Sequence, residues 1–381
     1  MMPEQAARFD LSADERKLLA FAQEVAAPYA VYQGALPLAT LQEIFRKLQP
    51  SGYLGSILPV AAGGKGLSPI AFAALVEGLS PALPLLGNQS VQRYLHDFGS
   101  EAIRRRFLPG LLSGDDIGAI AISEAQAASD LSRVETLAMK HGSGWKITGR
   151  KTWVTHGMTA ALFIVLARTG EAPGQFTRFI LTPDMPGFVR RPLEPIGLTH
   201  LTFAELELNG CEVSDELRLD GEGEGASGAK AAFPIARLLA ALQALRIAQA
   251  AIDIAAEYAR ERIVAGSALV ERSLVQRGHA DLWARIEAAR LLSYRAAANL
   301  ADLEASTLAS GAKAIGGELA LEACRWAAEC MGSSALPASH PLHRLHNDAR
   351  MMAVVDGTSL LNQLVVARRG IARGTSQRTK S

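Results

Sequence analysis

The sequence predicts an α+β protein of several domains: an N-terminal all-α domain, a middle β-barrel or sandwich domain, and a C-terminal four-helix bundle. Three observations predict this order. Helix start signals mark the first 114 residues, short β-rich runs separated by turn residues continue to residue 213, and a helical spacing of apolar residues follows. We expect the domains to span residues 1–116, 117–219 and 220–381. A chain of 381 residues is long enough to bury two or three separate cores.

Two segments of the N-terminal region have a Ser or Thr followed three residues later by Glu, the capping-box pattern of a helix start. They are SADE at residues 12–15 and TLQE at residues 40–43. Ser68 followed by Pro69 predicts a third helix start. The glycine-rich stretch LPVAAGGKGLS just before it predicts an irregular loop. It is not a Walker motif, because the required ending of a lysine followed by a hydroxyl residue is missing.

The middle region contains five predicted strands, rich in β-formers and bounded by turn residues. They are GAIAIS, GWKITGRKTWVT, ALFIVLART, FTRFILT and LTFAELELNG. In the last run Ala204, Leu206 and Leu208 alternate with three polar residues, so we expect a sheet with one face in water.

The C-terminal region opens with DGEGEGASGAK at residues 220–230, which predicts a glycine-rich hinge. The apolar residues that follow recur three and four positions apart, which predicts one buried helix face. They are Ile235, Leu238, Leu239, Leu242, Leu245 and Ile252. Similar stretches at residues 281–303 and 306–331, with a last helix after Thr358, predict a bundle of about four helices.

The composition excludes several classes of protein. Lys plus Arg is 39 and Asp plus Glu is 38, so no bulk charge attracts nucleic acid or an anionic membrane. No run of eighteen uncharged apolar residues occurs, and we expect a soluble protein. The three cysteines, Cys211, Cys324 and Cys330, form no CxxC pair, which favours a reducing cytoplasm. His340, His343 and His346 spread around more than half a helix turn, and we expect no metal site.

Four segments, in order, resemble motifs of the acyl-CoA dehydrogenase family of flavoproteins. They are LPVAAGGKGL, AISEAQAASDLSRVETLA, ITGRKTWVTHG and RLHNDARMMAVVDGTSLLNQLVVAR. The resemblance implies a homo-oligomer, usually a tetramer, with FAD between the β domain and the bundle. It also implies a reaction in which a base removes the α proton of an acyl-CoA or acyl-carrier thioester while hydride leaves the β carbon for flavin N5. Electrons would then pass to an electron-transfer flavoprotein or another acceptor.

The resemblance also assigns the FAD contacts. Ser123 stands at the position of a Thr that contacts the flavin ring, and Ser129 at that of a Ser near the FAD phosphates or the substrate chain. Trp153 and Thr155 match residues that cover the flavin and form hydrogen bonds near its N5 atom. A Trp and a Thr that alternate along one strand usually just pack a sheet, however. The remaining predicted FAD contacts are Arg262, Gly332 and Thr358.

Asp356 matches the catalytic Glu of most of the family, and Arg237 an Arg that borders it. Two simpler interpretations stay open: Asp356 as an N-cap, and Arg237 as a surface helix arginine. If Asp356 is buried beside Val354 and Val355, desolvation raises its pKa, which suits a base near neutral pH.

Several residues depart from the family pattern. Asp356 is one methylene shorter than Glu, and relatives with Asp as base include nitroalkane oxidases. The FAD segments are altered at the positions Ala265, Glu329, Ser333, Ala335 and Asn347. A carboxylate at 329 would repel an FAD pyrophosphate unless it points away. The alternatives to a dehydrogenase are therefore a nitroalkane-oxidase-like flavin oxidase and a non-catalytic family member with weakened FAD binding.

Overall fold

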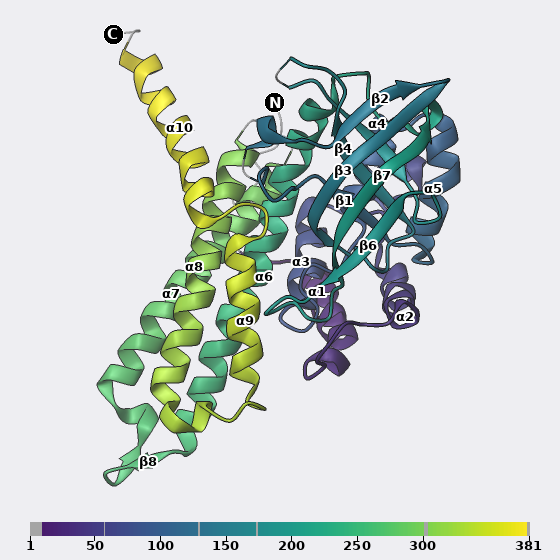
Figure 1. The fold of residues 1–381 in the computed structure, drawn as a ribbon. Coiled ribbons are helices and arrows are strands. Elements are labelled where there is room, and N and C mark those ends of the chain that lie inside the picture. Colours follow the sequence, from purple (N-terminus) through teal and green to yellow (C-terminus); the bar gives the residue numbers. More distant parts are fainter. Residues whose placement is uncertain (1–9, 57, 129, 173, 301–303, 379–381) are drawn as a thin grey trace.

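The computed structural model describes residues 10–378 except 57, 129, 173 and 301–303. Helices lead into a sheet, and a long helical bundle follows, so the predicted fold class is confirmed (Figure 1). The N-terminal helices are α1 (Ala13–Ala26), α2 (Leu38–Leu48), α3 (Pro69–Leu79), α4 (Gln89–Phe98) and α5 (Glu101–Ser113).

Two of the three predicted helix starts in this region are confirmed. Ser12 accepts from the N–H of Glu15 in a reciprocal capping box, and Ser68 caps α3 through the N–H of Ala71. The predicted start at residues 40–43 is wrong, because α2 already begins at Leu38 after Pro37. A proline fixes the backbone ahead of the first turn, so the helix forms two residues earlier than the Thr-Glu pattern suggests.

The middle region forms a seven-stranded sheet with the order β1-β4-β2-β3-β7-β6, in which β5 pairs with β4. The strands are β1 (Gly118–Ala121), β2 (Leu137–His141), β3 (Gly144–Thr155), β4 (Leu162–Arg168), β5 (Phe176–Leu181), β6 (Phe188–Leu193) and β7 (Phe203–Ser214). β2 and β6 escaped prediction because their exposed residues break the apolar alternation. In β7 the predicted alternation is confirmed, with Ala204, Leu206 and Leu208 buried.

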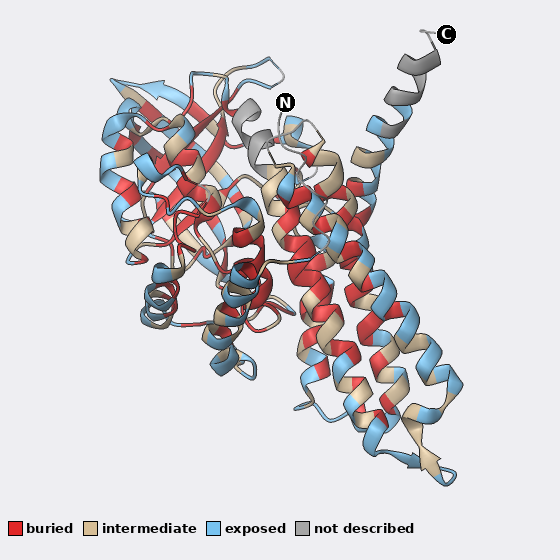
Figure 2. Ribbon diagram, turned by 180° about the vertical axis from the view of Figure 1, so that it is seen from behind, coloured by how far each residue is buried: buried red, intermediate tan, exposed pale blue. Residues whose placement is uncertain are grey.

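The bundle contains α6 (Gly225–Glu261), α7 (Ser273–Ala298), α8 (Ala305–Met331), α9 (Pro341–Val354) and α10 (Ser359–Arg378). A small hairpin of β8 (Ile263–Val264) and β9 (Ser267–Ala268) joins α6 to α7 at the far end. The hinge predicted at residues 220–230 is too long, because its second half, from Gly225 onward, belongs to α6. The stretch Phe233–Glu261 of α6 is long and apolar enough to cross a membrane, but it is mostly buried among the other helices. Figure 2 shows the buried residues on the inward faces of the bundle.

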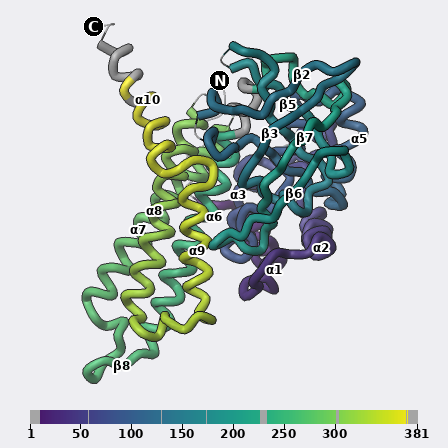
Figure 3. The backbone as a smooth tube through the Cα atoms, viewed as in Figure 1, coloured from purple at the N-terminus to yellow at the C-terminus, as the bar shows by residue number. Residues whose placement is uncertain are grey.

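Helix α9 joins the bundle to both other regions. Asp348 Oδ1 accepts from the N–H of Leu198, in the loop between β6 and β7. One turn earlier, Arg344 donates to four carbonyls of the N-terminal region, those of Tyr29, Ala30, Pro81 and Ala82. The chain then turns sharply after α9, and α10 packs on α8 before it runs away from the bundle (Figure 3).

Candidate active site

The turn between α9 and α10 carries Asp356. α9 ends at Val354 and α10 begins at Ser359. Within the turn Asp356 has φ +55° and Gly357 has φ +95°. The left-handed region is unfavourable for residues with a Cβ, although Asp and Asn enter it more readily than most. The conformation of Asp356 therefore depends on support from outside the turn.

Three buried side chains supply this support through main-chain carbonyls. From α6, Arg237 Nε donates to the carbonyl of Asp356 at 3.4 Å. From α8, Lys313 Nζ donates to the carbonyls of Ala353, at 2.7 Å, and Gly357. From α10, Asn362 Nδ2 donates to the carbonyls of residues 356, 357 and 358 at 3.4, 2.9 and 3.1 Å. Three helices thus fix the backbone that presents the Asp356 carboxylate.

The carboxylate itself has no such partner. Within the described part of the chain, no hydrogen bond or ion pair joins the side chain of Asp356 to a neighbour. Burial raises its pKa, while the positive charges of Lys313 and Arg237 act in the opposite direction. A half-buried carboxylate with a raised pKa and open lone pairs is well suited to accept a proton.

Asp356 is not a helix cap, so that interpretation is wrong. Thr358 Oγ1 accepts from the N–H of Leu361 at 3.3 Å and caps α10, two residues after Asp356. The predicted burial beside two valines holds only in part. Val354 is 61% exposed at the end of α9, whereas Val355 packs against the bundle core. Desolvation of the carboxyl group therefore comes from helices packed around the turn rather than from Val354.

Arg237 is not a surface arginine. Its side chain is buried, its Nη1 donates to Ser310 Oγ at 3.0 Å, and its guanidinium lies 5.4 Å from the ring centre of Phe233. Burial lowers its pKa, and the charge of Asp356 opposes that shift. Sequence reasoning missed Lys313 and Asn362. A lysine within the small-residue run SGAKAIGG of a buried helix was the available signal for the first.

Trp153 stands at a break in the pairing of β3 with β7, where the register shifts between Lys151 and Val154. It has φ +55°, its side chain is 51% exposed, and its ring meets the ring of Phe203 edge-on at 5.9 Å. Phe203 in turn belongs to the core that the sheet shares with the bundle. The indole of Trp153 is therefore not buried in the packing of the sheet. It presents an open aromatic surface beside the junction of sheet and bundle. Thr155, paired with Phe203 in the register, is also partly exposed.

Ser123 follows β1 and lies against β3, since its carbonyl accepts from the N–H of Thr152 at 2.9 Å. The next residue, Glu124, forms a buried ion pair with Lys151 at 2.7 Å. This pair, which the sequence did not reveal, holds the Ser123 segment beside Trp153. Ser129 lies outside the described residues.

Arg262 and Gly332 lie elsewhere. They end α6 and α8 at the β8–β9 end of the bundle, whereas the Asp356 turn is at the other end (Figure 1). Within a single chain, Arg262 and Gly332 therefore do not lie near Asp356. Gly332 has φ 58° and ψ −132°, and a Cβ built there meets nothing within 4 Å, which leaves an open, glycine-specific surface. The Glu329 side chain is 71% exposed and lies 3.9 Å from Arg325, which partly offsets its charge.

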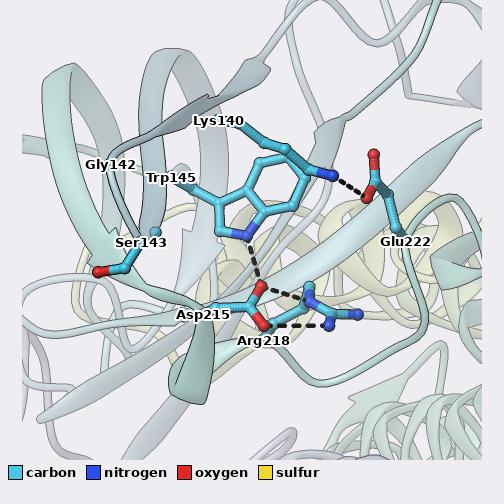
Figure 4. A pocket seen from close by; sticks show the side chains of 8 residues that line it. Lys140, Gly142, Ser143, Trp145, Asp215, Arg218 and Glu222 are labelled. Carbon is cyan, nitrogen blue, oxygen red and sulfur yellow. Dashed lines mark hydrogen bonds and ion pairs between the residues drawn. The ribbon is translucent and has the colours of Figure 1, made fainter.

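These residues fit a flavin cofactor. A flat aromatic surface at Trp153, hydroxyl groups at Ser123 and Thr155, and an exposed Thr358 suit a planar ring with polar edges. A concave area elsewhere on the molecule offers less. On the outer part of the sheet, the groups that line a shallow hollow pair with one another (Figure 4). Trp145 Nε1 donates to Asp215, Asp215 pairs with Arg218, and Lys140 pairs with Glu222.

Comparison with known proteins agrees with this arrangement. Family models of the acyl-CoA dehydrogenase N-terminal, middle and C-terminal domains match residues 15–115, 119–211 and 223–371. Benzylmalonyl-CoA dehydrogenase of Aromatoleum aromaticum is 33% identical over 377 residues, which cover 94% of this chain and 98% of the relative. The 3-sulfinopropanoyl-CoA desulfinase of Paraburkholderia xenovorans is 30% identical over 343 residues, 87% of this chain and 88% of the relative.

The fold of the chain also matches that of a solved acyl-CoA dehydrogenase. The structure of butyryl-CoA dehydrogenase from Megasphaera elsdenii superposes with a TM-score of 0.89 at 26% identity, covering 96% of this chain and 100% of that chain. All three domain models match in order, and together they span most of the chain. The chain belongs to the acyl-CoA dehydrogenase family.

Proposed function

We propose that the chain is an FAD-dependent acyl-CoA dehydrogenase that introduces a double bond between the α and β carbons of an acyl thioester, with Asp356 as the base. One observation carries the choice of base. The Asp356 side chain is half-buried and has no hydrogen-bond or ion-pair partner among the described residues, while three helices hold its backbone. The family supports the thioester substrate, because the relatives compared above are named for reactions of CoA esters.

The reaction places a specific demand on this site. The α proton of a thioester is a weak acid, so the base must lie within hydrogen-bond reach of the α carbon and must be freed from water. Burial raises the pKa of Asp356, which strengthens it as a base. The α C–H bond breaks and its proton goes to Asp356, while the β C–H bond breaks with loss of hydride and the C=C bond forms. Trp153, Ser123, Thr155 and Thr358 would hold FAD, which would supply the hydride acceptor.

The two electrons then leave the protein. We assign the acceptor role to an electron-transfer flavoprotein, as the family resemblance implies. In support, a solved structure that concerns the electron-transferring flavoprotein of Acidaminococcus fermentans contains a chain that superposes on this one with a TM-score of 0.86 at 28% identity. The free thiols of Cys211, Cys324 and Cys330 are consistent with a reducing cytoplasm, where we place the enzyme. The distant position of Arg262 and Gly332 supports a homo-oligomer in which these residues reach the FAD of a second copy.

The test is anaerobic mixing of the purified yellow protein with butyryl-, isovaleryl-, glutaryl- and benzylmalonyl-CoA, with flavin absorbance as the readout. We expect at least one thioester to bleach the flavin. In Asp356→Asn, which keeps the size of the side chain but removes the base, FAD stays bound and bleaching falls by at least about a thousandfold. Bleaching by nitroalkanes alone would identify a nitroalkane oxidase. A protein that stays colourless after incubation with FAD would identify a non-catalytic member.

A further inference from the structure

Lys313 is a buried ammonium group without a carboxylate partner. It is 1% exposed, and among the described residues no ion pair within 4.0 Å includes it. Its hydrogen bonds go to the carbonyls of Ala353 and Gly357. Removing an ammonium from water costs several kcal/mol unless charge and hydrogen bonds compensate. A charge kept at this position therefore indicates a role beyond packing.

The two carbonyls flank Asp356 on either side. The carbonyl of Ala353 belongs to the last turn of α9, where carbonyls have no helical N–H partner. The carbonyl of Gly357 comes after the left-handed Asp356. A single Nζ that binds both carbonyls fixes the length and direction of the segment between them. Together with Arg237 and Asn362, Lys313 therefore helps to set the backbone position from which the Asp356 carboxylate extends.

We propose that Lys313 is a positioning residue that closes the Asp356 turn and supplies the base with a nearby positive charge while leaving its carboxylate oxygens open. The inference rests on the proposed function of Asp356. A direct ion pair would occupy those oxygens and weaken the base. Because Lys313 donates to the flanking carbonyls instead, its charge acts on Asp356 without blocking the approach of a substrate.

The charges around the turn come from several elements. Arg237 on α6 and Lys313 on α8 are the cations that act on Asp356, Tyr94 on α4 also interacts electrostatically with it, and Glu318 acts on Lys313. Burial lowers the pKa of Lys313 to about 8, so the ammonium is still largely charged at neutral pH. Removal of its charge is expected to raise the pKa of Asp356 further, because one of two opposing cations is lost.

The test uses the FAD-loaded protein and the variants Lys313→Met and Lys313→Arg. The first readout is the infrared band of the protonated Asp356 carboxyl group, identified by its absence in Asp356→Asn and followed against pH. We expect its midpoint to rise by about one pH unit in K313M and to stay near the wild-type value in K313R. The second readout is flavin bleaching by the most active acyl-CoA. In K313M we expect kcat to fall by about ten- to a hundredfold with KM unchanged, and K313R to restore much of it.

The control is Lys47→Met on α2, which removes a surface lysine paired with Glu43 at 2.8 Å and should change neither readout. If K313M does not fold, Lys313→Gln keeps N–H donors without the charge and gives the same comparison. A wild-type midpoint and rate in the uncharged variant, with D356N inactive, would overturn the role of Lys313 alone. Wild-type bleaching by D356N would instead overturn the proposed base, and the inference with it.

Discussion

The ammonium of Lys151 lies 2.7 Å from a carboxylate oxygen of Glu124, and neither side chain is more than 3% exposed. Glu124 also accepts from the main-chain N–H groups of Glu135 and Thr136 and from the Thr136 hydroxyl. The pair therefore joins three segments of the sheet domain, two of which carry Ser123 and Trp153, residues proposed to face FAD.

The first prediction concerns this pair. Lys151→Met leaves a buried carboxylate without its counter-charge and is expected to lower the free energy of unfolding by ~3–5 kcal/mol. Thermal and urea unfolding of the FAD-free protein would measure the loss. The double variant Glu124→Gln with Lys151→Met removes both charges and should be less destabilised than K151M. If the double variant is as unstable as the sum of the two single variants, the two charges do not stabilise each other.

Acid pH should destabilise the protein through two buried histidines. Burial lowers the pKa of His156 to about 4 and that of His200 to about 3, from an ordinary value of 6.5. Below pH 6.5 the unfolded chain binds these protons and the folded chain does not. Stability is therefore fully present above pH 6.5 and is lost as the pH falls toward about 4, by on the order of 3 kcal/mol for His156.

Urea unfolding at pH 7.5 and 4.5 would measure this loss. His156 has φ 59°, so His156→Asn suits the left-handed backbone and should reduce the pH dependence. His141→Asn, at a side chain that is 58% exposed, is the matched control. An unchanged pH dependence in H156N would show that His156 does not contribute.

Trp153 should contribute to FAD affinity far more than to folding. Its side chain is half exposed, so Trp153→Ala should cost the FAD-free protein no more than about 1 kcal/mol of stability while it weakens FAD binding by about tenfold or more. Titration of FAD by flavin fluorescence, beside thermal unfolding of the FAD-free protein, separates the two effects. Met139→Ala on β2, a side chain with 55% exposure, should leave FAD affinity unchanged. Equal affinity in W153A and the native protein would remove Trp153 from the flavin site.

The apolar face of α10 should support the homo-oligomer. Leu360 and Leu364 are 66% and 43% exposed, and their spacing of four residues places them on one face of the helix. Replacing both with Asp should shift the assembly toward smaller species in analytical ultracentrifugation, because burial of a carboxylate in an interface is costly. Gln363→Glu, at an exposed position beside these leucines, controls for the added charge. An unchanged sedimentation coefficient in the Leu variants would place the interface elsewhere.

The local signals in the sequence explain which parts of the fold were predictable. The capping box at Ser12 and the alternation in β7 are encoded within a few residues, and both are confirmed. The start of α2 was misplaced because Pro37 and the buried Leu41 outweigh the Thr-Glu pattern. The strands β2 and β6 have exposed residues that hide their period, and only pairing with their neighbours defines them.

The candidate site shows the same division. Family motifs placed Asp356 and Arg237, which the structure brings together across 119 positions of sequence. The roles of Lys313 and Asn362 stayed hidden, because a hydrogen bond to a main-chain carbonyl leaves no mark on the residue that accepts it. The orientation of Asp356 was equally hidden, since its positive φ depends on contacts from three helices.

The support of the Asp356 turn through its carbonyls has a consequence for evolution. Because Arg237, Lys313 and Asn362 bind the main chain, the identity of the side chain at 356 is free to change without repacking the scaffold. A left-handed backbone accepts Asp more readily than Glu, which gives the shorter acid a conformational advantage at this position. A single substitution between Asp and Glu would therefore change how far the base extends, and with it which carbon acids it can deprotonate. The hydrogen bonds that hold the main chain of the turn would stay the same.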